Sequence, residues 1–122
     1  MHSTTARLAV IGLVGALLSA CGGGSEDDDP AARGAALFRG EATCAVCHGR
    51  DLQGTPMGPS FLDQIYAPDH HPDAAFLAAV RNGVQPHHWA FGPMPALPHV
   101  DADDVDDIIA FVRREQRAAG ID

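Results

Sequence analysis

The stretch Cys44-Ala45-Val46-Cys47-His48 decides how this chain is interpreted. Two thiols three positions apart, followed at once by a histidine, form the C-x-x-C-H pattern of covalent c-type haem attachment. The thiols of Cys44 and Cys47 can add to the two vinyl groups of one porphyrin and form thioethers. The imidazole of His48 then lies under the ring, where it can ligate the iron. The pattern therefore predicts one covalently bound haem c.

Other uses of the motif cysteines are less well supported. A thioredoxin-like C-x-x-C would need a βαβ context, and no run of alternating or β-branched residues is present. A disulfide framework would need an even number of cysteines in the mature domain. A zinc site would need a second ligand pair at motif spacing. His70/His71 and His87/His88 are adjacent pairs without that geometry, so haem is favoured over zinc.

The first twenty residues predict a processed leader and not a part of the fold. Residues 1–7 are weakly basic, and residues 8–18 are an apolar run typical of a signal-peptide core and too short to span a bilayer. The segment 18–21 (LSAC) resembles the lipobox of bacterial lipoproteins, in which the cysteine becomes the lipidated N-terminus. An ordinary secretory signal with a chance cysteine is the alternative. We expect residues 1–20 to be removed and Cys21 to anchor the protein in the bacterial cell envelope, facing the periplasm or the exterior.

The rest of the chain divides into a linker and one small domain. Residues 21–30 are glycine-rich and then acidic, which predicts a flexible, extended tether. Residues 31–122 contain no internal repeat, and a core of this size is marginal unless a buried cofactor fills its centre. The formal net charge is −8 and the chain has no lysine, which argues against nucleic acid and anionic lipid headgroups as partners.

Periodicity predicts three helices and no sheet. The first covers residues 31–39, the second begins with Pro72 and ends before Gly83, and the third covers residues 102–119. The third has the clearest apolar stripe, formed by Val105, Ile108, Ile109 and Val112. Asp101 can cap this helix. Three arginines near its end suit the negative pole of the helix dipole: Arg113, Arg114 and Arg117.

Residues 31–122 resemble a class I cytochrome c domain. The order of an N-terminal helix, C-x-x-C-H, a Gly/Pro loop, a middle helix, a methionine between prolines and a C-terminal helix carries the resemblance. It implies an all-α domain wrapped around one haem, with the first and last helices crossing so that Gly34 and Phe38 meet Phe111. It also implies a one-electron carrier and not an enzyme. The sequence shows neither a nucleophile–base pair nor paired carboxylates in a motif context, so it gives no indication of a catalytic site.

The resemblance also suggests the groups around the iron. His48 is the proximal ligand, and a ligating imidazole usually donates its other N–H to a fixed acceptor. The carbonyl of Pro59, in the segment 58–62, is the candidate acceptor. Met94, between two prolines that restrict its loop, is the candidate sixth ligand. Met57 lies in the loop that supplies Pro59, so we assign it to packing.

Several histidines remain as competing ligands. His87 or His88 would give bis-histidine ligation and a lower reduction potential, whereas His/Met ligation raises it. Three further histidines are weaker candidates: His70, His71 and His99. Trp89 could donate its indole N–H to a haem propionate, pack on the haem, or do both. Arg50 or Arg81 could pair a propionate, and the sequence does not choose between them.

The expected partners are redox proteins in or at the membrane. Without lysine, docking through apolar contacts near the haem edge, helped by Arg or His, fits better than a basic ring. The protein would act as a monomer or as a complex subunit. Two alternatives remain: a haem subunit of a larger oxidoreductase or respiratory complex, and a ligand-binding or peroxidatic haem protein with a displaceable sixth ligand.

Overall fold

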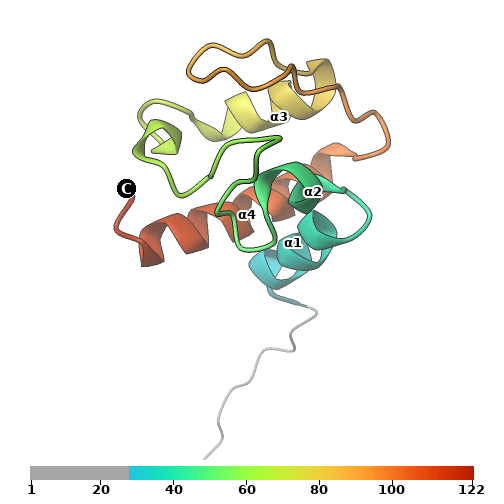
Figure 1. Cartoon of the computed structure of the whole chain (residues 1–122). Coiled ribbons are helices and arrows are strands. Elements are labelled where there is room, and N and C mark those ends of the chain that lie inside the picture. Colours follow the sequence, from blue (N-terminus) through green and yellow to red (C-terminus); the bar gives the residue numbers. More distant parts are fainter. Residues whose placement is uncertain (1–27) are drawn as a thin grey trace, which may run out of the picture.

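The fold class is confirmed by a computed structural model that describes residues 28–122. These residues form four α-helices and no strand (Figure 1). The helices are α1 (Pro30–Arg39), α2 (Cys44–His48), α3 (Asp73–Asn82) and α4 (Ala102–Ala118), with a 3-10 turn at Gln64–Tyr66. The predicted signal peptide, Cys21 and most of the linker lie outside the described residues. Within residues 28–122, no helix is both long enough and apolar enough to cross a membrane.

Helices α1 and α4 pack closely, and the predicted contact of Phe38 with Phe111 is confirmed, whereas Gly34 lies nearest to the backbone of Asp107 and Ile108. A Cβ on Gly34 would overlap the backbone carbonyl of Asp107, so only glycine permits this approach. The ring of Phe38 meets that of Phe111 edge-on, with centroids 5.6 Å apart. Arg33 spans the same two helices, donating from two nitrogens to the Asp107 carboxylate at 2.8 and 2.9 Å. The buried aromatic pair holds α1 against α4, and the two-pronged ion pair at the surface adds a second contact between the helices.

Three predicted helix ends are wrong by one residue, each where a cap decides the boundary. Asp29 caps α1 by accepting from the Ala31 N–H at 3.0 Å, and Pro30 is the first helical residue. Pro30, which the sequence assigned to the linker, is therefore part of the helix. Pro72 has an extended backbone and is the N-cap of α3, not its first residue. At the other end, α4 stops at Ala118.

The C-x-x-C-H segment is itself the one-turn helix α2, which periodicity did not predict. Thr43 enters it with a left-handed φ of 59°, and Gly49 leaves it with φ 79°. The helical turn sets Cys44, Cys47 and His48 at positions i, i+3 and i+4, which share one face. The local backbone thus directs the two thiols and the imidazole to the same side.

Arg113 does not serve the helix dipole as predicted. Its side chain is only 9% exposed and turns inward from α4. It donates to the backbone carbonyls of Tyr66 and His71 and to the carboxylate of Asp73. Gln116, which is fully buried, accepts from Arg113 and donates to the Tyr66 carbonyl at 3.2 Å. These two side chains fasten the loop before α3 to the last helix.

Candidate functional site

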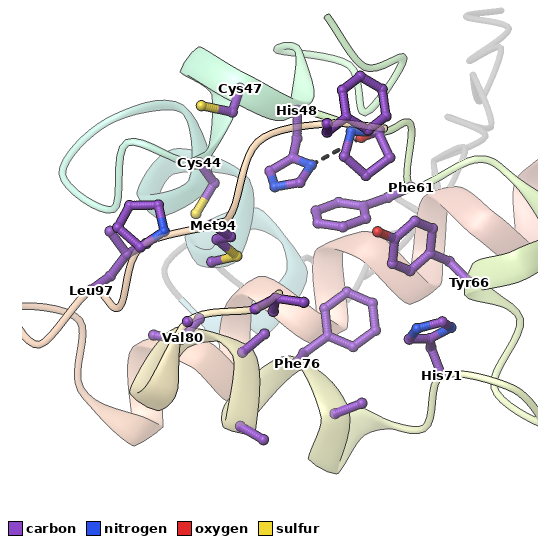
Figure 2. Close-up of a pocket in the computed structure, with 18 of the residues that line it drawn as sticks. Cys44, Cys47, His48, Phe61, Tyr66, His71, Phe76, Val80, Met94 and Leu97 are labelled. Atoms are coloured by element: carbon purple, nitrogen blue, oxygen red, sulfur yellow. Dashed lines mark hydrogen bonds between the residues drawn. The ribbon is translucent and has the colours of Figure 1, made fainter. Parts of the chain in front are cut away.

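A largely apolar cavity of about 690 Å³ lies between α2, α3 and the loop that precedes α4 (Figure 2). Its volume is in the range of about 300–1,000 Å³ that is usual for small-molecule and cofactor sites. Four predicted haem-site residues line it: Cys44, Cys47, His48 and Met94. Pro59 and Trp89 line it as well. The fold therefore brings these six predicted haem-site residues to one cavity.

The two motif cysteines stand at one end of the cavity with their sulfurs drawn in Figure 2. Both are half-buried and neither is in a disulfide. Burial raises the pKa of the Cys44 thiol to about 11, so this group is protonated at neutral pH. The Cys47 carbonyl accepts from the Thr55 hydroxyl at 2.7 Å. A Cβ on Gly58 would lie 2.9 Å from that same carbonyl oxygen, so the loop that contains Gly58 packs directly against the motif.

His48 is oriented by the carbonyl of Pro59, which lies 2.9 Å from its Nδ1. A carbonyl can only accept, so Nδ1 carries the hydrogen and Nε2 keeps its lone pair. Burial lowers the pKa of His48, although the bond to Pro59 opposes this, and the imidazole is neutral at pH 7. Its ring also stacks on Phe61, with centroids 4.2 Å apart. This is the geometry of a metal ligand with a fixed tautomer.

Met94 reaches the same cavity from the loop after α3, and Figure 2 shows its thioether among the lining side chains. Its backbone forms an isolated two-residue bridge with Val84. Met57 is 57% exposed and does not line the cavity. Met94 is therefore placed to contribute sulfur to a group inside, whereas the prediction that Met57 packs in its loop is wrong, because its side chain is mostly exposed.

Aromatic side chains line the cavity on the side away from the cysteines, where Figure 2 shows Phe61 and Tyr66. Trp89 stacks on Tyr66 with ring centroids 5.7 Å apart, and Phe61 meets Tyr66 edge-on at 4.9 Å. Burial, with the nearby charge of Asp63, raises the pKa of Tyr66 to about 12. Sequence reasoning missed Tyr66 because a single tyrosine in a loop forms no pattern. The two propionate candidates among the arginines, Arg50 and Arg81, do not line the cavity.

The histidine pairs are close together, which contradicts the expectation that they lack the geometry of a metal site. The ligand nitrogens of His70, His71 and His88 all lie within 4.8 Å of one another. Desolvation and the neighbouring histidines lower the pKa of His88. His87 lies beside this group, whereas His99 does not line the cavity. The two histidine pairs lie in separate loops and do not have the spacing of a known metal-binding motif. The sequence therefore could not predict that they meet.

Comparison with known proteins agrees with this geometry. The family model for cytochrome c matches residues 31–115, which is most of the chain and most of the residues that the structure describes. No curated protein and no solved structure matches the chain significantly. Domains of this family carry haem c bound covalently, and Cys44, Cys47 and His48 fit its attachment motif. The chain therefore belongs to the cytochrome c family, and it is an electron-transfer protein with one covalent haem c.

Proposed function

We propose that this protein is a class I, monohaem electron carrier in which His48 and Met94 are the axial ligands of the iron. The observation that carries the proposal is that these two side chains, from distant segments, line one cavity together with Cys44 and Cys47. A neutral imidazole with a free Nε2 and a thioether are the donor set expected for such a centre.

When bound, haem c supplies the chemistry, the uptake and release of one electron at iron. The protein's own residues tune that chemistry. Pro59 holds the His48 ring in one orientation, so the ligand need not rearrange between oxidation states. The soft thioether of Met94 favours the reduced state and raises the potential. The apolar walls keep water away from the centre, and Trp89 supplies packing and an indole N–H toward a propionate.

The ligand assignment is tested by near-infrared absorption of the oxidised, haem-loaded protein. We expect a weak methionine–iron charge-transfer band in the wild type. This band should disappear in Met94→Ala and persist in Met57→Ala, the matched control whose side chain lies outside the cavity. A band that survives Met94→Ala would show that another methionine occupies the sixth position. Absence of the band from the wild type would point to a different ligand, such as a neighbouring histidine.

We further propose that Cys21 is lipidated and tethers the domain to a membrane of the bacterial cell envelope, with the haem outside the cytoplasm. Residues 8–21 support this through their apolar run and lipobox-like end. Mass spectrometry of the mature protein should find acyl chains on an N-terminal Cys21, and Cys21→Ser should release the protein from the membrane fraction. Recovery of residues 1–20 in the mature protein would contradict this.

The proposed partner is a redox protein that docks beside the haem attachment site. Val46, inside the motif, is 61% exposed, and Met57 is 57% exposed. These apolar side chains, in a chain without lysine, favour contact by burial over charge pairing. Electron transfer with a membrane-bound partner should then depend only weakly on ionic strength, since screening affects charge pairs and not apolar contacts. A steep salt dependence would indicate charged docking instead.

A further inference from the structure

Four histidines gather at the edge of the cavity on two different loops. His70 and His71 lie in the turn before α3, and His87 and His88 lie in the loop after it. Their rings are near neighbours: the centroids of His70 and His88 are 5.1 Å apart, and those of His71 and His88 are 5.2 Å apart. Neither the covalent attachment nor the proposed axial ligation uses them.

The nitrogens of this group have the spacing of ligands that share one metal ion. Nε2 of His70 lies 3.3 Å from Nε2 of His88. Two imidazole nitrogens, each about 2.0–2.1 Å from a tetrahedral zinc, are separated by roughly 3.3–3.4 Å. The ligand nitrogens of His70, His71 and His88 all lie within 4.8 Å of one another. Because His70 and His88 are exposed, small side-chain rotations can close the remaining gap to His71.

His71 is already oriented as a ligand. Its Nδ1 lies 2.6 Å from the carbonyl of Ile65, which can only accept, so Nδ1 carries the hydrogen and Nε2 has the lone pair. Its backbone carbonyl accepts from the buried Arg113. A carbonyl acceptor behind the imidazole is the usual outer contact of a metal-bound histidine.

We propose that His70, His71 and His88 form a binding site for a divalent transition-metal ion of the zinc and copper class, at the edge of the haem cavity. Imidazole nitrogens select these ions over calcium and magnesium, which prefer oxygen. The exposed side chains leave a path for the ion and an open coordination position for water. The formal net charge of −8 favours the approach of a cation. This inference rests on the proposed ligation of the iron by Met94, because His88 can bind a second metal only if it is not a ligand of the iron.

The site is tested by calorimetric titration of the haem-loaded protein with Zn²⁺. We expect one ion per chain, and at least tenfold weaker binding in His70→Ala and in His88→Ala. His99→Ala is the matched control, because His99 is an exposed histidine that does not line the cavity, and it should bind as the wild type does. Haem absorption spectra of all variants establish that each is folded. Absence of binding at one ion per chain, or equal affinity in His88→Ala, would overturn the proposal.

The position of the site gives a second measurement. His88 and Met94 line the same cavity, so a cation at the cluster adds positive charge beside the haem. Positive charge favours the reduced state, in which the centre has gained an electron. Zn²⁺ at the lowest concentration that saturates the wild type should therefore raise the midpoint potential of the wild type and of His99→Ala, and should raise that of His88→Ala much less. A potential that does not change when Zn²⁺ binds to the wild type would contradict the placement of the site beside the haem.

Discussion

Val84 and Met94 exchange both of their backbone hydrogen bonds, each N–H donating to the other's carbonyl at 3.0 Å. The bridge joins the methionine segment to the residue that follows the C-cap of α3. Three residues further on, the Leu97 N–H donates to the carbonyl of Val80 at 2.8 Å. The chain around Met94 is thus tied to the end of α3 at two points. A weak thioether ligand needs such a fixed backbone, because each freely rotating bond would favour its detachment.

Gly83→Ala should loosen this bridge. Gly83 has φ 72° and ψ 177°, a region that is almost exclusive to glycine, and a Cβ there would lie 2.6 Å from the Met94 carbonyl oxygen. We expect a loss of stability of about 1–3 kcal/mol. The methionine–iron band should also disappear at a lower guanidinium concentration than in the wild type. Near-infrared absorption along a denaturant titration measures both effects.

Gly92→Ala is the control for that experiment. Gly92 lies two residues before Met94, and a Cβ added there would have no atom within 4 Å. Its variant should keep the wild-type band at all guanidinium concentrations below unfolding. If Gly83→Ala behaves like Gly92→Ala, the Val84 bridge does not position the methionine.

Gly34→Ala tests the close crossing of α1 and α4 by the sign of the change in the free energy of unfolding. In an ordinary helix interior, replacing glycine by alanine stabilises by about 1 kcal/mol. In α1 the added Cβ would overlap the Asp107 carbonyl of α4, so the two helices must separate. We expect a net loss of at least about 2 kcal/mol in the free energy of unfolding, as for overpacked cores. Any stabilisation of the haem-loaded protein by this substitution would refute the close crossing.

The sequence predicted those features that depend on neighbours along the chain. The spacing of Cys44, Cys47 and His48 predicted the attachment, and the apolar stripe of α4 predicted which face is buried. Gly34 and Phe111 were predicted to meet because the family resemblance supplied a contact that no local pattern contains. Helix ends shifted only where a cap, such as Asp29, decided the boundary.

The features that the sequence did not predict depend on residues far apart in the chain. Arg113 is a charged residue near the end of a helix, where the sequence predicts exposure to solvent. It is buried instead, because backbone carbonyls of a loop some forty residues earlier accept its hydrogen bonds. The group of His70, His71 and His88 likewise forms only when the loops on both sides of α3 meet. Neither arrangement follows from spacing or periodicity.

Replacing Arg113 should cost far more than replacing its ion-pair partner. Arg113→Met leaves the His71 carbonyl without the guanidinium donor and the Tyr66 carbonyl with only the bond from Gln116, at about 2–4 kcal/mol in the free energy of unfolding. The Asp73 side chain is 66% exposed and stays solvated, so Asp73→Asn should cost less than about 1 kcal/mol. Guanidinium unfolding of the haem-loaded variants measures both values. Equal costs would mean that the surface ion pair, and not the buried carbonyl contacts, holds the loop on α4.

Tyr66 should make the protein lose stability in alkaline solution. Burial and the charge of Asp63 raise its pKa from 10.0 to about 12, so between these values the unfolded chain has released the phenolic proton and the folded chain has kept it. The unfolded state then binds fewer protons, and the free energy of unfolding falls as the pH rises through this window. Tyr66→Phe, which keeps the ring and has no titratable group, should lose less stability over the same interval. Guanidinium unfolding at about pH 9.5 and about pH 11.5, on either side of the ordinary tyrosine pKa of about 10, measures the difference between the two proteins. Identical losses in both would show that the Tyr66 phenol titrates alike in the folded and unfolded states.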